Sequence, residues 1–252
     1  METYLSPIGD NLLSQLSALP SNSLGAKINV YKSEETFPDL SQIKIVILGV
    51  EEGYEESKPY LSLDSIRLAF YSLYEGNWKH QIADIGNILA GHKRSDTLFA
   101  LQEVIQSLLK QDILPIILGG GQDLVYAQYK AYHYQNRMLN FVNVDHSFDL
   151  GDIEAPISPR SYVGKMVSEE PYRLFNYTVL GYQSYYNSAD EIALMDTLMF
   201  DSYRIGELVS DITQVEPYVR NAEFASFDLK SIQASFVGNI HSYPNGFDSR
   251  EI

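Results

Sequence analysis

The sequence predicts a three-layer α/β fold, in which a mostly parallel sheet carries helices on both faces. From residue 43 onward, apolar segments of strand length alternate with segments of helical periodicity, which is typical of parallel sheets with crossover helices. The chain has 252 residues, of which 45% are apolar and 12% aromatic, so it is long and apolar enough to bury a large core. Polar residues follow several of the predicted strands, at the edge where parallel sheets bind ligands.

Residues 1–42 are expected to form an N-terminal extension that packs on the main domain, residues 43–252. Proline, glycine and serine interrupt this extension, and such residues mark turns and loops. Leucines at helical spacing between Leu12 and Leu19 predict one short amphipathic helix within it.

The main domain contains regular strand and helix patterns in alternation. Its predicted strands are short apolar runs, of which the first (IKIVILGV) is β-branched and ends at acidic residues, as a buried parallel strand would. These strands cover residues 43–50, 115–118, 138–144, 177–180 and 224–227. The predicted helices cover residues 63–74, 95–109, 124–136, 191–199 and 212–220.

Composition excludes several classes of function. The chain has 18 Lys and Arg against 33 Asp and Glu, a net charge of −15, which disfavours nucleic acids and anionic membrane surfaces. It has no cysteine, so disulfides, thiolate catalysis and cysteine-bound zinc are excluded. No apolar run approaches the roughly 18 residues of a membrane span. The first residues lack a basic segment followed by an apolar one, so we expect a cytoplasmic protein.

Three segments place polar side chains directly after predicted strands. They are LGGGQD (118–123), NVDHSFDLGD (143–152) and SFDLK (226–230). Each could be an ordinary turn or helix cap, and Gly119–Gly121 lacks the Lys-Ser/Thr of a phosphate loop. Because strand ends of a parallel sheet meet at one edge, we favour a common cleft.

In order and local context, the three segments resemble the ureohydrolase family of arginase, agmatinase and formimidoylglutamase, and most of all formimidoylglutamase-like members. That family has the pattern G-G-x-H, D-x-H-x-D and S-x-D-x-D, which holds two manganese ions. Supporting similarities are Asp84–Asn87, expected to follow a short strand, Gly181–Tyr182 in a later strand and the turn at 244–247. The resemblance covers about residues 43–252. It implies an arginase-like fold and hydrolysis of linear amidines by a hydroxide that bridges two metals.

The resemblance places the family's metal ligands on a mixed set of residues. Three expected ligands are replaced, the two histidines by Gln122 and Ser147 and the last aspartate by Lys230. Three aspartates are kept, Asp145, Asp149 and Asp228. Half of the expected ligand set is therefore changed.

These replacements imply a degenerate metal site. Gln122, Asp145, Asp149 and Asp228 form an all-oxygen set for at most one ion, either Mn²⁺, Mg²⁺ or Ca²⁺. The second ion would need the positions of Ser147 and Lys230, and an ammonium group there repels a cation. We infer that Lys230 replaces the second metal by pairing with Asp145 and Asp228; a solvated surface lysine is the alternative.

The chain also lacks the histidine that shuttles protons in arginase-like members, since the corresponding residues 157–162 contain none. His146 lies between Asp145 and Ser147, and on an extended segment it would point away from the cleft. A loop would break that alternation. We expect a packing or surface histidine.

Two hypotheses about function follow. The first is a catalytically impaired family member that acts in binding, regulation or structure, without a cofactor. The second is a hydrolase of C–N bonds in linear amidines that uses one metal or an altered site. The expected partners are a small amidine or guanidino ligand, a protein partner and, as in the family, further copies of the chain. The resemblance also implies another strand and helix after the third segment, so we expect the sequence to be a piece of a longer protein.

Overall fold

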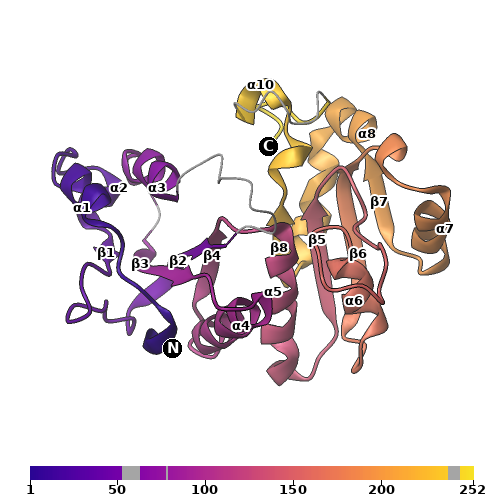
Figure 1. Ribbon diagram of the computed structural model, residues 1–252. Coiled ribbons are helices and arrows are strands. Elements are labelled where there is room, and N and C mark those ends of the chain that lie inside the picture. Colours follow the sequence, from indigo (N-terminus) through magenta and orange to yellow (C-terminus); the bar gives the residue numbers. More distant parts are fainter. Residues whose placement is uncertain (53–62, 78, 238–244) are drawn as a thin grey trace. The chain divides into compact units, whose positions relative to one another are not determined.

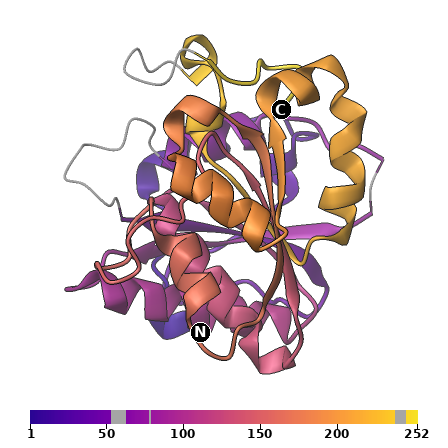
Figure 2. The same ribbon diagram turned by 90° about the vertical axis from the view of Figure 1, so that its right-hand side faces the viewer.

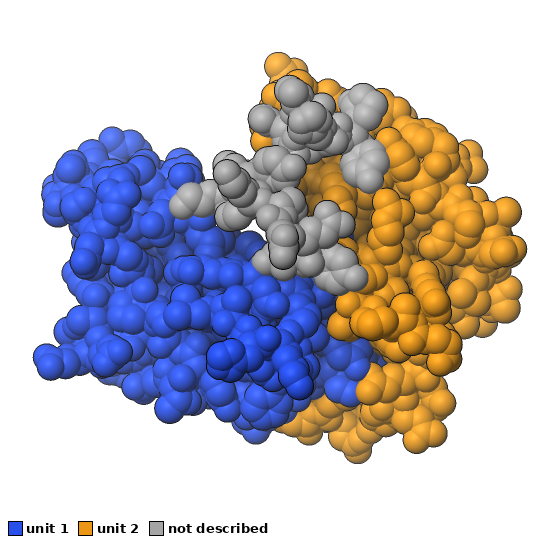
Figure 3. Space-filling view, in the orientation of Figure 1, with its two compact units in different colours: residues 1–132 blue, residues 133–252 orange. Residues whose placement is uncertain are grey.

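The computed structural model describes residues 1–52, 63–77, 79–237 and 245–252 (Figure 1). The chain divides into two compact units, Met1–Tyr132 and His133–Ile252, which Figure 3 colours separately. Each unit contains a four-stranded sheet in which all neighbouring strands run parallel. Helices accompany both sheets. The predicted α/β class with parallel strands is therefore confirmed.

Unit 1 has the strand order β1-β3-β2-β4. Its strands are β1 (Asn29–Val30), β2 (Ile43–Glu51), β3 (Gln81–Leu89) and β4 (Leu114–Leu118). Its α-helices are α1 (Asp10–Leu16), α2 (Leu24–Lys27), α3 (Leu63–Tyr71), α4 (Arg94–Leu109) and α5 (Val125–Ala131), with short 3-10 turns η1 (Glu2–Tyr4) and η2 (Gln122–Leu124). Because β1 lies within residues 1–42 and pairs with β3, the N-terminal segment contributes an edge strand to this sheet.

Strand β2 is apolar from Ile45 to Val50 because both of its faces are covered there. Val46 and Leu48 point to one face, where they pack with apolar residues of α4 and α5. Ile47 points to the other, where it packs with α1, α2 and α3. Figure 1 shows the two groups of helices on opposite sides of the strands. Such burial on both faces is typical of parallel strands.

A fully buried ion pair lies inside unit 1. Arg67 of α3 donates to both carboxylate oxygens of Asp84 on β3, at 2.6 and 3.1 Å, and both side chains are 0% exposed. Its remaining donors bond Asn87 Oδ1 and the Gly86 carbonyl, and the Tyr71 hydroxyl also bonds Asp84. Asp84 and Asn87 lie within β3, whereas the sequence pattern predicts that they follow a short strand.

Unit 2 has the strand order β7-β6-β5-β8. Its strands are β5 (Leu139–Val144), β6 (Leu174–Tyr182), β7 (Asp201–Arg204) and β8 (Phe224–Phe227). Its α-helices are α6 (Tyr162–Ser168), α7 (Ala189–Thr197), α8 (Ile205–Ser210), α9 (Glu216–Asn221) and α10 (Ala234–Val237), and its 3-10 turns are η3 (Tyr132–Gln135, which begins at the boundary), η4 (Ser184–Tyr186), η5 (Ile212–Val215) and η6 (Leu229–Ser231). Figure 2 shows helices on both sides of these strands.

The two faces of the unit 2 sheet have different cores. Val142 and Val144 of β5 pack on one face with Leu208 of α8 and with residues of η5 and α9. On the other face, Phe141 stacks on Tyr177, with ring centroids 5.2 Å apart, and also contacts Tyr162 of α6. The aromatic face lies beneath the carboxylate residues described below.

Several elements differ from the predicted ones. The helix expected at residues 124–136 is divided among η2, α5 and η3, and Asn136 ends it at a φ of 50°. The helix expected at 212–220 is divided between η5 and α9. Strand β7 (DSYR) lies at a sheet edge and has no apolar run, so the pattern does not reveal it. Pro244 of the predicted turn lies outside the described residues.

No helix in the described parts of the chain combines the length and the apolar character that crossing a bilayer requires. The longest of them, α4, has 16 residues and begins with charged ones.

Candidate functional site

Unit 2 brings three aspartates that match the family pattern, Asp145, Asp149 and Asp228, to one edge of its sheet. Asp145 directly follows β5 and Asp228 directly follows β8, and these strands are neighbours with Val144 paired to Phe227. Asp149 lies four residues after Asp145, and both are buried. Each of the three carboxylates acts electrostatically on another. The predicted convergence of these side chains therefore occurs within this unit.

Asp149 carries the least satisfied carboxylate of the site. Its Oδ1 accepts a hydrogen bond from the Ser147 hydroxyl at 2.8 Å. Its Oδ2 is buried and has no hydrogen-bond partner among the described residues. Burial, and after it the charge of Asp145, raises the pKa of Asp149 well above its ordinary value. Among the described residues, no lysine, arginine or histidine forms an ion pair with Asp149 that would compensate an ionised carboxylate.

Asp145 is held by its own loop. Its Oδ1 accepts from the backbone N–H of His146 and Ser147, and His146 Nδ1 lies 2.6 Å from the same oxygen. The His146 ring is buried and stands edge-on to Tyr186, with centroids 4.9 Å apart. His146 is thus buried and not at the surface. Its ring turns toward the Asp145 carboxylate and not away from it, because residues 145–149 form a loop without the alternation of a strand.

Asp228 lies between a carboxylate and a lysine. Burial, and then the charge of Asp145, raises its pKa, whereas Lys230 lowers it. Lys230 Nζ lies 3.9 Å from Asp228 Oδ2, and the lysine side chain is 43% exposed. The contact is at the limit of an ion pair and open to water, where such pairs are weak. The proposed role of Lys230 and Ser147 in replacing a metal stays a prediction.

Replacement of Lys230 tests that role. We expect Lys230→Met to leave the midpoint of urea unfolding unchanged, since the ammonium is half in water. The same change should raise the affinity for Mn²⁺ about threefold, because it removes one unit charge that acts mostly through solvent. Isothermal titration calorimetry would measure this, with Lys165→Met as a control for a lysine elsewhere in the unit. A large loss of stability would instead support a structural pair between Lys230 and buried carboxylates.

Gln122 belongs to unit 1, where it begins η2 after the glycine turn. Gly119 and Gly120 there have φ values of 81° and 78°, which glycine adopts without strain. The neighbouring Asp123 is buried and paired with Arg94, whose Nε and Nη2 lie 2.9 and 2.6 Å from its oxygens. Arg94 Nη1 also lies 3.2 Å from Glu52. Participation of Gln122 in a site with the three aspartates stays a prediction.

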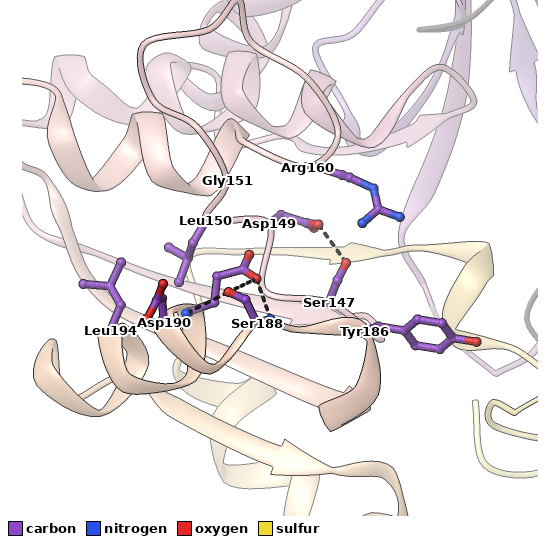
Figure 4. Close-up of a pocket in the computed structure, with 10 residues that line it drawn as sticks. Ser147, Asp149, Leu150, Gly151, Arg160, Tyr186, Ser188, Asp190 and Leu194 are labelled. Carbon is purple, nitrogen blue, oxygen red and sulfur yellow. Dashed lines mark hydrogen bonds between the residues drawn. The ribbon is translucent and has the colours of Figure 1, made fainter.

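A cavity of about 430 Å³ opens beside Asp149 (Figure 4). In Figure 4, Asp149 and Ser147 point toward each other, and Arg160 lies near them on the same side. The cavity lining comprises Ser147, Asp149, Leu150, Gly151, Arg160, Tyr186, Ser188, Asp190, Glu191 and Leu194. The side chain of Arg160 has no hydrogen bond or ion pair with any other described residue. It is the cationic side chain of this lining, so it can pair with an anionic ligand group.

The sequence pattern does not mark Arg160, Tyr186 and Glu191 as site residues. Arg160 lies in the segment 157–162, which lacks the histidine of arginase-like members. Because η4 and α7 follow β6, the neighbour of β5, residues after the strand end at Tyr182 reach the same edge as Asp149. The position after a strand end was the available signal.

Among residues 1–52, 63–77, 79–237 and 245–252, no three His, Cys, Asp or Glu side chains are grouped as a ready-made metal site. At the carboxylate cluster, Asp145 Oδ1 is occupied by donors of its own loop. The donor chemistry still suits a hard cation, because the carboxylates offer oxygen only. The buried and unbonded Asp149 Oδ2 is the atom that such an ion would satisfy.

Comparison with known proteins agrees with this geometry. A family model described as the arginase family matches residues 55–252. A formimidoylglutamase of Staphylococcus epidermidis is 26% identical over 219 residues, which cover 77% of this chain and 68% of that protein.

Solved structures share the fold at low sequence identity. The formimidoylglutamase of Bacillus subtilis superposes with a TM-score of 0.71 at 17% identity, covering 85% of this chain and 74% of the other. A Trypanosoma cruzi formiminoglutamase solved with Mn²⁺ superposes with a TM-score of 0.74 at 14% identity, covering 91% and 82%. These likenesses confirm the expected arginase-like fold.

Proposed function

Because this chain belongs to the arginase family, we propose that it is a cation-dependent hydrolase that cleaves a C–N bond of a linear amidine, as a formimidoylglutamase does. The observation that carries this proposal is the set of buried Asp145 and Asp149 with partly buried Asp228, beside a cavity of about 430 Å³. Clustered carboxylates cost free energy in a buried place unless a cation or a proton compensates them. An enzyme site is a reason to retain them.

A single divalent cation fits the chemistry of these side chains. Asp149 Oδ2 and Asp228 would hold it, together with the carboxylate of Asp145. When bound, such an ion would acidify a water molecule for attack on an amidine carbon. Mn²⁺, Mg²⁺ and Ca²⁺ all accept oxygen ligands, and the Mn²⁺ in the T. cruzi structure favours manganese.

The residues of the chain supply substrate binding around that carbon. Glu191 lies in the same cavity and can bind the positively charged amidine nitrogens. Leu150 and Leu194 add apolar surface that excludes water from the bound substrate.

Arg160 makes an amidine with a carboxylate the preferred substrate. The guanidinium pairs well with a carboxylate group, which N-formimidoyl-L-glutamate has and agmatine lacks.

An activity assay with two substrates tests the proposal. The Mn²⁺-loaded protein should release glutamate from N-formimidoyl-L-glutamate and act weakly on agmatine. Arg160→Met should raise KM for the first substrate at least about tenfold, the loss of one charge-assisted pair, with kcat changed much less. Agmatine turnover, which does not use the pair, should stay the same. Equal effects on both substrates would contradict the carboxylate assignment.

The competing hypothesis is an impaired family member that acts by binding. It rests on the replacement of expected ligands by Ser147 and Lys230 and on the loosely grouped donors in the described structure. Elemental mass spectrometry after dialysis against Mn²⁺, and then against metal-free buffer, separates the two. About one retained equivalent supports the hydrolase, whereas near-zero metal with no turnover supports the impaired protein.

A further inference from the structure

Beneath the carboxylates, unit 2 buries an amide and two phenols that the proposed chemistry does not use. Asn143 on β5, Tyr162 on α6 and Tyr177 on β6 are each 0% exposed. The Asn143 Nδ2 lies 3.1 Å from the Tyr162 hydroxyl, 3.2 Å from the Tyr177 hydroxyl and 3.3 Å from Asp145 Oδ2. We refer to these three residues as the brace, since one amide ties three elements to the carboxylate of Asp145.

The brace lies in apolar surroundings, where polar groups need a partner. The Tyr177 ring stacks on Phe141, and the Tyr162 ring meets the same phenylalanine edge-on at 6.4 Å. Phenylalanine at either tyrosine position would fill the same space without a hydroxyl to satisfy. The hydroxyls must therefore be explained by what they bond, because burying them only for packing is unfavourable.

The hydroxyl of Tyr177 bonds the loop that carries Asp149. Its hydroxyl donates to the Phe148 carbonyl at 3.1 Å, and the Phe148 N–H donates to Asn187 Oδ1 at 2.8 Å. The peptide groups before and after Phe148 are thus fixed by two different segments, strand β6 and the residues between η4 and α7. Asp149 itself has a φ of 53°, a conformation that residues other than glycine adopt rarely. Such a residue persists where its surroundings determine it.

We propose that Asn143, Tyr162 and Tyr177 are positioning residues that fix the orientation of Asp145 and of the Phe148–Asp149 peptide, and thereby set the affinity of the carboxylate cluster for a divalent cation. The inference rests on the proposed function for its cation. Groups that hydrogen-bond metal ligands from behind orient them, and their loss commonly weakens metal binding about 10- to 100-fold. Here the brace acts on one carboxylate directly and on a second through the backbone.

The test compares Tyr177→Phe with Tyr71→Phe, each of which removes one hydroxyl from a fully buried tyrosine. In Tyr71→Phe the lost partner is Asp84 of unit 1, so this variant is a control for stability alone. Two quantities are measured: Mn²⁺ affinity by titration calorimetry, and amide hydrogen exchange of peptides covering residues 145–151 in cation-free buffer. Tyr162→Phe serves as a second brace variant.

We expect Tyr177→Phe to lower the Mn²⁺ affinity about tenfold and to speed exchange in residues 145–151 about fivefold, the effect of one lost hydrogen bond. Tyr71→Phe should change neither. Unchanged affinity with faster exchange would overturn the proposal and leave the brace a support of the fold. Unchanged exchange would overturn the positioning of the loop. Wild-type protein that binds no Mn²⁺ would overturn the proposed function and the link to cation affinity, while exchange would still decide whether the brace holds the loop.

Discussion

Arg67→Met should destabilise unit 1 by about 3–5 kcal/mol, since removal of one partner leaves the buried charge of Asp84 without compensation. The pair is 0% exposed on both sides, so water cannot replace the guanidinium. Arg67 also bonds Asn87 and the Gly86 carbonyl, and these acceptors would lose their donors too. Urea unfolding followed by circular dichroism, with amide exchange in β2 and β3 to identify the unit, measures the loss.

A matched control separates burial from ion pairing as such. The pair between Lys44 Nζ and Asp112 Oδ2 has a similar length, 2.7 Å, but lies half in water. Lys44→Met should leave the unfolding midpoint unchanged, because exposed pairs contribute little. The double variant Arg67→Met/Asp84→Leu should recover much of the stability lost in Arg67→Met. If Arg67→Met were as harmless as Lys44→Met, the buried pair would not stabilise the fold.

The fold could be predicted from sequence wherever burial imposed a pattern. Strand β2 is covered on both faces and therefore has an apolar sequence, IKIVILGV, that only the exposed Lys44 near its start interrupts. Strand β7 pairs on one side only and has the sequence DSYR, which no apolar period marks. The burial of Arg67 could not be predicted either, because a charged residue in an amphipathic helix is expected at the surface. Its contact with Asp84 on β3 explains the burial.

The candidate site was predictable in its carboxylates and not in its surroundings. Asp145 and Asp228 each follow a strand, and parallel neighbours bring such positions together. Arg160 lies in a long loop that lines the cavity, and the side chain of Tyr177 extends from β6 to the Phe148 carbonyl. Neither depends on a local period or motif, so tertiary structure alone reveals them.

Asp149→Asn should make the cation-free protein more stable at neutral pH and abolish its affinity for Mn²⁺. Burial, and then the charge of Asp145, raises the pKa of Asp149 well above the ordinary value of 3.8. As the pH rises above 3.8, the unfolded chain releases a proton that the folded protein retains. Stability therefore falls with rising pH, by about 1.4 kcal/mol per pH unit for one retained proton, until the folded pKa is passed.

The substitution removes this pH dependence because an amide does not titrate. Below pH 3.8 the wild type and Asp149→Asn should have similar stability, and the advantage of the variant should grow through the window above that value. The exposed Asp152, in the same loop, provides the control Asp152→Asn, which should keep the slope of the wild type. Mn²⁺ should reverse the order: at 100 times its Kd it would stabilise the wild type by about 2.7 kcal/mol and the variant not at all. A variant less stable than the wild type at neutral pH without cation would show that the Asp149 charge is already compensated within the protein, and the need for a cation at this site would disappear with it.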